Sequence, residues 1–117
     1  MNKSLKEMVE NLETSVSRLD LISKRKTAGF IKTMDQLFDE GPLDPKTKEL
    51  ISIAVTTAIR CEPCIAVHVL RGLEMGCTKE EILDAASVAV IFTGSAGLAY
   101  MNNVVLDAID EFSKTTT

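Results

Sequence analysis

Apolar residues recur at helical spacing along most of the chain, and no segment shows the two-residue alternation of a β-strand. Ser4 and Glu7 form a capping box that opens the first such segment. Its apolar positions are Leu5, Met8/Val9, Leu12, Val16, Leu19 and Ile22. A second segment covers Thr27 to Asp39, before Gly41, and its predicted inward positions are Phe30, Met34, Leu37 and Phe38. The pattern predicts two amphipathic helices.

Asp44 and Pro45 predict the start of a third helix, because an aspartate cap followed by proline suits a first turn that needs no donor. This helix should reach about Ile59. Its inner positions are almost uncharged, which places it near the middle of the fold: Leu50, Ile53, Ala54, Thr57 and Ala58. Glu49 lies early in the segment. Position alone favours interpreting Glu49 as an exposed carboxylate stabilised by the helix dipole.

Pro63 predicts a break near Cys61 and a new helix from about Glu62 to Met75, with Gly76 as its left-handed cap. A second capping box opens a fifth helix, whose positions are Thr78, Glu81, Ile82, Ala85, Ala86, Ala89 and Val90. The glycines of residues 94–97 permit either a sharp corner or a close helix contact, before a last helix from Leu98 to Phe112 and a frayed tail. The sequence predicts one all-α domain over residues 1–117, a bundle of about six helices.

Composition supports this fold class and narrows the partners. Of the 117 residues, 45% are hydrophobic and only 4% are aromatic, which favours closely packed helices. The net charge of −4 and a single basic run, residues 24–26, argue against a nucleic-acid surface. Residues 1–10 lack the apolar run of a signal peptide or membrane anchor, so we expect a cytoplasmic protein. In a reducing compartment, a close cysteine pair indicates redox chemistry or metal binding.

The chemistry is concentrated at Cys61, Cys64 and His68, the last being the only histidine. A thiol with a pKa near 8.5 is little ionised at neutral pH, but a helix amino terminus and a nearby base favour the thiolate. Cys64 and His68 are four residues apart and therefore share a helix face. We predict Cys64 as the nucleophile, and Cys61 as the thiol that attacks an oxidised Cys64 and closes a disulfide.

Glu49 precedes Cys61 by twelve residues, which on one continuous helix would be roughly 18 Å. If the chain folds back at Cys61, Glu49 and His68 instead lie at similar heights on antiparallel helices. The carboxylate could then orient the imidazole in a proton relay. The alternative is that His68 is a histidine with its hydrogen bonds satisfied in the core.

The spacing Glu-x11-Cys-x2-Cys-x3-His, formed here by Glu49, Cys61, Cys64 and His68, resembles the signature of alkylhydroperoxidase D-like proteins in the carboxymuconolactone decarboxylase family. The similarity extends from about Leu43 to Leu98, residues 43–98 being the redox core. It includes the Leu-Ile-x-Ile-Ala-Val run before the cysteines and the Ala-Val-His-x-x-x-Gly-Leu-x-x-Gly-Cys-Thr-x-Glu-Glu-Ile run after them.

This resemblance implies an all-α, alkylhydroperoxidase D-like fold that needs no cofactor or metal and reduces hydroperoxides or small disulfides. By carry-over, Cys64 is the peroxidatic nucleophile, Cys61 the proton donor and resolving thiol, and His68 with Glu49 the proton relay. An external dithiol protein would be the reductant, and the chain would assemble as a trimer or hexamer. Members without the cysteines act on carboxymuconolactone, and the cysteines here weigh against that activity. Glu62-Pro63 departs from peroxidase members that carry histidine between the cysteines, and an acidic neighbour disfavours the thiolate.

Two other classes stay open. Cys61, Cys64 and His68 could bind zinc, with Cys77 or Glu49 as a fourth ligand. The chain could also be a non-catalytic oligomeric module that senses oxidants. Cys77 itself is best interpreted as a small buried apolar residue at a helix junction.

Overall fold

The computed structural model describes residues 4–116, and the side chains of residues 4–114. All regular structure in that part of the chain is helical, which confirms the all-α prediction. The elements are α1 (Leu5–Ser17), the 3₁₀ helix η1 (Arg18–Leu21), α2 (Lys24–Asp39), α3 (Pro45–Ala58), α4 (Glu62–Glu74), α5 (Lys79–Thr93), α6 (Ser95–Tyr100), the π-helical segment η2 (Met101–Val105) and α7 (Leu106–Thr116). None of the described helices is long and apolar enough to cross a membrane.

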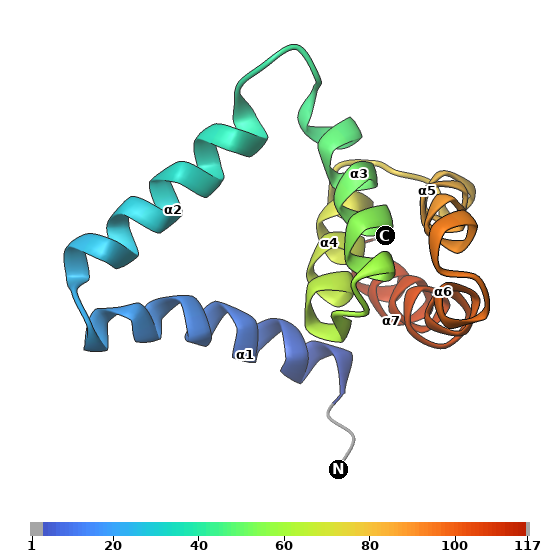
Figure 1. Cartoon of the computed structure of the whole chain (residues 1–117), viewed down its shortest axis with the longest axis horizontal. Coiled ribbons are helices and arrows are strands. Elements are labelled where there is room, and N and C mark those ends of the chain that lie inside the picture. Colours follow the sequence, from blue (N-terminus) through green and yellow to red (C-terminus); the bar gives the residue numbers. More distant parts are fainter. Residues whose placement is uncertain (1–3, 117) are drawn as a thin grey trace.

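Helices α3 to α7 gather on one side of the molecule, while α1 and α2 form an arm that reaches away from them and bends at η1 (Figure 1). Helix α3 packs against both α4 and α5, and α4 also packs against α1 and α7. Helix α4 is therefore the central element, with neighbours on several sides. The arm returns to the other helices where α2 meets α3 (Figure 1).

The core lies where α3, α4, α5 and α7 meet. Its fully buried large side chains include Ile53, Ile65, Ile82, Val69, Val105 and Ile109. Gly72 lies in this core, where a Cβ would be in ordinary van der Waals contact, 3.5 Å from Cδ1 of Ile53 and 3.6 Å from Sγ of Cys77. Each buried side chain of this size contributes about 1.5–3 kcal/mol relative to exposure, so this cluster fixes the position of α4.

The predicted helix starts are confirmed by their caps. The side chains of Ser4, Asp44 and Thr78 each accept a hydrogen bond from the backbone N–H three residues later, and Glu81 completes the box with Thr78. The hydrogen bond from the backbone N–H of Thr47 lowers the pKa of Asp44. The backbone N–H of Thr78, followed by Lys46, likewise lowers the pKa of Glu81. Helix α2 begins at Lys24, earlier than predicted, because Ser23 caps it.

Three inward predictions in the arm are wrong: Ile22, Phe30 and Leu37 are exposed. The apolar pattern predicts one helix through residue 22, but α1 ends at Ser17 and the 3₁₀ geometry of η1 shifts the helical phase. Helix α2 packs mainly against η1 and, at its carboxyl end, α3. Much of its apolar surface therefore has no neighbour within the chain.

Both alternatives for residues 94–97 occur together. Gly94 has φ of 62° and turns the chain between α5 and α6, while a Cβ on Gly97 would clash with Oγ1 of Thr93. The helical path thus resumes at Ser95, before the predicted Leu98, and passes through η2 into α7. Residues 113–116, expected to be frayed, belong to α7. Thr117 lies outside the described residues.

Candidate functional site

The two cysteines lie at the amino terminus of α4 and are joined by a disulfide, with 5.2 Å between their Cα atoms. Cys61 is the N-cap residue and Pro63 occupies the first turn, as the sequence predicted. The unpaired N–H groups of a first helical turn favour negative charge. The site is therefore suited to hold a thiolate at Cys64 when the pair is reduced.

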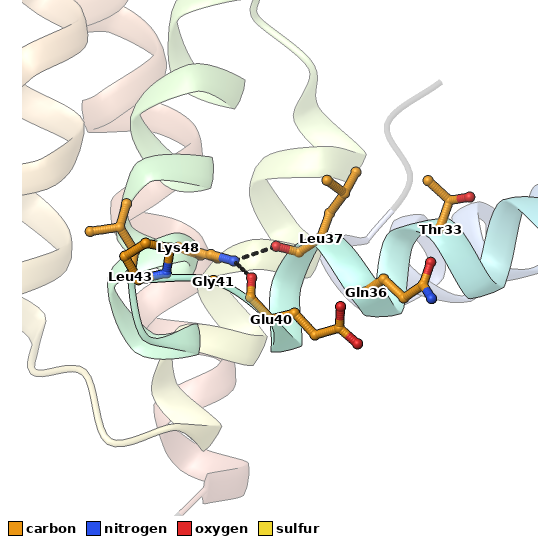
Figure 2. A pocket seen from close by; sticks show the side chains of 8 residues that line it. Thr33, Gln36, Leu37, Glu40, Gly41, Leu43 and Lys48 are labelled. Atoms are coloured by element: carbon orange, nitrogen blue, oxygen red, sulfur yellow. Dashed lines mark hydrogen bonds between the residues drawn. The ribbon is translucent and has the colours of Figure 1, made fainter.

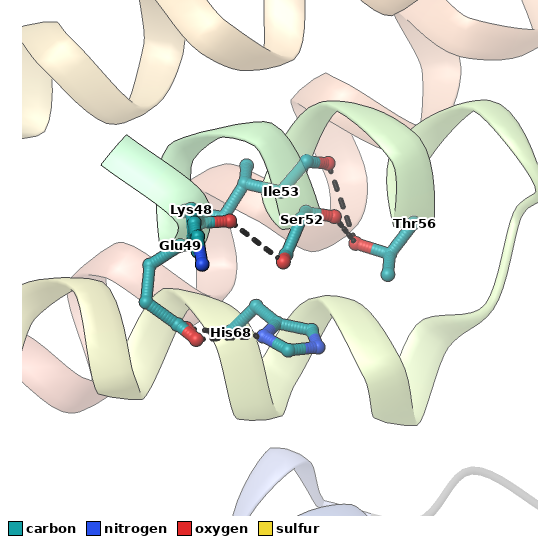
Figure 3. A network of polar contacts seen from close by, with 6 residues as sticks. All are labelled: Lys48, Glu49, Ser52, Ile53, Thr56 and His68. Atoms are coloured by element: carbon teal, nitrogen blue, oxygen red, sulfur yellow. Dashed lines mark hydrogen bonds and ion pairs between the residues drawn. The ribbon is translucent and has the colours of Figure 1, made fainter. Parts of the chain in front are cut away.

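The chain folds back between α3 and α4, and this brings Glu49 to His68. Nδ1 of His68 lies 3.2 Å from Oε1 and 3.1 Å from Oε2 of Glu49. Figure 3 shows Glu49 reaching down from α3 to the imidazole on α4. Glu49 and His68 are thus close together, as predicted. His68 is paired with a carboxylate and lies one helical turn after Cys64 on α4.

Position alone gave the wrong environment for Glu49. Its side chain is 1% exposed, not a surface carboxylate. The helix begins at Pro45, so Glu49 falls in its second turn, on the side that α4 covers. A buried carboxylate is costly without partners. His68 is such a partner, so the Glu49–His68 contact joins α3 to α4 at their interface.

The geometry also assigns the two ring nitrogens. An ionised carboxylate only accepts hydrogen bonds, so opposite an ionised Glu49 it is Nδ1 of His68 that donates, and in the neutral imidazole Nε2 is then the acceptor. Figure 3 shows Nε2 directed toward the amino-terminal end of α4, where the cysteines lie. The hydroxyls of Ser52, Thr56 and Thr57 donate to backbone carbonyls within α3. These three hydroxyls therefore have hydrogen-bond partners within α3 and do not need Glu49 or His68 as partners.

Sequence reasoning missed one neighbour of the relay. The ring of Phe38, on α2, stacks on His68 with 5.8 Å between ring centroids and 17° between ring planes. The apolar pattern placed Phe38 inward but carried no sign that it would meet the histidine. That contact depends on where the arm returns to α3, which periodicity does not encode.

Two cavities flank the relay. One, of about 190 Å³, lies between α1, α2 and α4 and reaches His68; its other lining residues are Leu12, Glu13, Val16, Phe30, Met34, Phe38, Val67 and Arg71. The second, of about 260 Å³, reaches Glu49 and is lined by Met34, Asp35, Phe38, Asp39, Arg71 and Met75. Arg71 borders both. Its position three residues after His68, on the same helix face, was the signal that could have identified it.

Cys77 stands apart from this chemistry. It is a free, buried thiol that packs beside Gly72, and burial raises the pKa of the Cys77 thiol. The prediction of a small buried residue at a helix junction is confirmed. Among the described residues, no group of three or more His, Cys, Asp or Glu side chains is arranged to hold a metal ion.

Fold and site together define an all-helical protein with a CxxC disulfide at a helix amino terminus and, beside it, a half-buried histidine paired with a buried carboxylate. Residues 27–107 match the carboxymuconolactone decarboxylase family, and the chain belongs to this family. The resemblance read from the Cys61-to-His68 motif is therefore confirmed at the level of the family.

Relatives and solved structures agree with this assignment. A protein encoded in the cox locus of Paracoccus denitrificans is 37% identical over 83 residues, which cover 69% of this chain and 75% of that protein. A family member from Legionella pneumophila has a TM-score of 0.80 and 26% identity, covering 97% of each chain. A Thermotoga maritima member, for which a role in the antioxidative response has been suggested, has a TM-score of 0.74 and 30% identity, covering 98% of this chain and 97% of its own.

Proposed function

We propose that the protein is a thiol-dependent peroxidase and disulfide reductase that uses Cys61 and Cys64 and is recharged by an external dithiol protein. The observation that carries the proposal is the Glu49–His68 contact beside the cysteine pair. A structural disulfide needs no buried proton relay. A nucleophilic thiol that gains and loses protons does.

The proposed reaction proceeds in three balanced steps. The Cys64 thiolate attacks a hydroperoxide oxygen, forming an S–O bond and breaking the O–O bond; the alkoxide leaves as an alcohol after taking a proton from Cys61 or His68. The Cys61 thiolate then attacks the sulfur of the Cys64 sulfenic acid, forming the S–S bond and breaking the S–O bond; the hydroxide leaves as water after taking a proton from His68. Finally, an external dithiol exchanges with the disulfide and is itself oxidised. A disulfide substrate enters by the same exchange, run in the opposite direction.

In this scheme His68 accepts and returns protons through Nε2, while Glu49 holds Nδ1 and stabilises the imidazolium. The Thermotoga relative supports an antioxidative role. We place the reaction in the cytoplasm, where external dithiols keep the pair reduced.

We also propose that the chain acts as a homo-oligomer. Large apolar side chains are exposed on α3 and α5, namely Ile51, Val55, Ile59, Val88, Ile91 and Phe92. Residues 85–106 contain no charged side chain, so two copies of this surface would meet without repulsion between like charges. Neither nucleic acid nor a membrane is proposed as a partner.

The test is hydroperoxide consumption by purified protein with several dithiol donors. Cys64→Ser should abolish turnover, and Cys61→Ser should leave Cys64 oxidised without closing the disulfide. Cys77→Ala is the matched control, because it removes a thiol that lies outside the site. A Cys64→Ser protein that consumes hydroperoxide at the wild-type rate would refute the mechanism.

The same assay separates the enzyme from an oxidant sensor. A sensor consumes one equivalent of hydroperoxide per pair and stays oxidised, whereas the enzyme turns over for as long as its dithiol is supplied. Stoichiometric zinc in protein purified without added metal would instead favour the metal-binding class.

A further inference from the structure

Helix α2 meets the relay at one side chain. Phe38 stacks almost parallel to the His68 ring, in the offset geometry that aromatic pairs favour. One face of the imidazole is therefore covered by the arm, while its Nδ1 edge is held by Glu49 from α3. Two different helices thus fix the orientation of the ring.

In the described part of the chain, the carboxyl end of α2 accepts side-chain hydrogen bonds from Lys48 of α3. The Nζ of Lys48 donates to the backbone carbonyls of Leu37, at 2.5 Å, and Glu40 (Figure 2). Leu37 lies in the last turn of α2 and Glu40 is its C-cap residue, so neither carbonyl has an intrahelical donor. A cation there also interacts favourably with the helix dipole. Leu37 directly precedes Phe38, so the bond fixes the backbone that carries the aromatic ring.

Lys48 and Glu49 are consecutive residues of α3, yet they hold different parts of one arrangement. Lys48 holds the helix end that carries Phe38, and Glu49 holds the imidazole that Phe38 covers. We infer that Lys48 and Phe38 are positioning residues, which act through His68 by fixing its ring against Glu49. This inference rests on the proposed function for its catalytic consequence, but its structural part can be tested without turnover.

The arrangement matters because α2 has few other anchors near the site. Phe30 and Met34 line a cavity that α1 and α4 also border, so these two side chains leave part of α2 without close packing beside the Phe38–His68 contact. Without the Lys48 bonds, the last turn of α2 would lose its two donors and Phe38 would leave the ring. The imidazole could then rotate, and Nε2 would no longer be held toward the cysteines.

The first measurement is the proton NMR signal of the imidazole. His68 is the only histidine, so the assignment is unambiguous in untagged protein. Stacking on Phe38 should shift its ring protons upfield. Lys48→Met keeps an unbranched side chain of similar length but removes the N–H donors of the ammonium group. We therefore expect the upfield shift to be lost. Lys48→Arg should restore it, because a guanidinium can donate to both carbonyls.

The second measurement is the alkylation rate of the reduced cysteine pair. Trypsin cleavage after Arg60, Arg71 and Lys79 places Cys61 and Cys64 on one peptide and Cys77 on another, so mass spectrometry reports the site alone. We expect Lys48→Met to slow alkylation about five- to twentyfold, within the loss that a misplacement of about 1 Å produces. Leu37→Ala is the control, because it truncates an exposed side chain and leaves the carbonyl in place.

A double-mutant cycle tests whether Lys48 acts through Phe38. If Lys48 acts through Phe38, Lys48→Met has no further effect on alkylation in a Phe38→Leu background. An unchanged imidazole signal in Lys48→Met, or an equal slowing in both backgrounds, would overturn the inference. Absence of hydroperoxide turnover in the wild-type protein would refute the proposed function but would leave this cycle interpretable.

Discussion

At the scale of single residues, the most informative side chain is Glu49. A carboxylate that is 1% exposed is expensive unless it is paired, and its partner here is a histidine 19 residues away on another helix. The pair places a negative charge where an imidazolium would form, one helical turn beyond Cys64. Stability alone would be served as well by two apolar side chains of similar size.

Glu49→Gln separates charge from shape. The amide keeps an oxygen that can accept from Nδ1, but it cannot stabilise the imidazolium. We expect kcat to fall about 10- to 100-fold with KM little changed, since the loss belongs to proton transfer. Steady-state kinetics with hydroperoxide and a fixed dithiol measure this. Glu74→Gln, an exposed carboxylate on α4, is the control, and wild-type kcat in Glu49→Gln would exclude the relay.

Local spacing predicted part of this site and not the rest. Cys61, Cys64 and His68 lie within two turns of one helix, so their proximity follows from helical geometry alone. Glu49 required the additional step that Pro63 breaks the helix and turns the chain back. Phe38 lies thirty residues before His68, and its stacking depends on the angle between the arm and α3, which no local pattern specifies.

At the scale of elements, α3 and α4 end in the same way. The N–H of Arg60 donates to Thr57 and that of Cys61 to Thr56; the N–H of Gly76 donates to Leu73 and that of Cys77 to Gly72. Both are Schellman caps with a left-handed residue, of φ 59° at Arg60 and 89° at Gly76. The first ends the helix directly before the cysteine pair, so its conformation sets where α4 starts.

Replacing the left-handed residue of each cap, by Arg60→Gly and by Gly76→Ala, should change the free energy of unfolding in opposite directions. Arg60→Gly relieves a left-handed strain of about 1–2 kcal/mol but adds unfolded-state entropy, so we expect a net gain of about 0.5–1 kcal/mol. Gly76→Ala should cost about 1–2 kcal/mol, since nothing crowds a Cβ there and only φ opposes it. Urea unfolding at one protein concentration measures both. A stabilised Gly76→Ala would contradict the assignment of the cap.

Helix starts were predictable because each cap is a short sequence signal. Ser4, Asp44 and Thr78 all cap as expected. The phase of the arm was not predictable, because η1 changes the residues per turn between Ser17 and Ile22 without any proline or glycine to mark it. This error is what placed Ile22 on the wrong face.

At the scale of the whole molecule, the composition predicted helices and a core, but the shape differs from a closed bundle. Between the contacts of α1 with α4 and of α2 with α3, the arm of α1 and α2 reaches away from the other helices (Figure 1), and many large apolar residues stay exposed. The apolar periodicity of the sequence predicts that these residues are buried against another surface. They do not distinguish burial within one chain from burial between copies.

The exposed part of α5 allows that distinction to be tested. Ile91 and Phe92 are each 81% exposed, inside a stretch without charge. Burying such side chains between copies would contribute about 1.5–3 kcal/mol apiece, so a carboxylate at either position should oppose assembly. We expect Phe92→Glu to yield a smaller species by light scattering coupled to size-exclusion chromatography, and Asn11→Glu, at an exposed polar position, to keep the wild-type mass.

Phe92→Glu should also keep the helical circular dichroism of the wild type, because its side chain has little contact within the chain. This keeps loss of assembly distinct from unfolding. Since the relay residues Glu49 and His68 belong to one chain, the imidazole signal should persist in the smaller species. A Phe92→Glu protein with the wild-type mass would show that copies do not meet through this surface of α5.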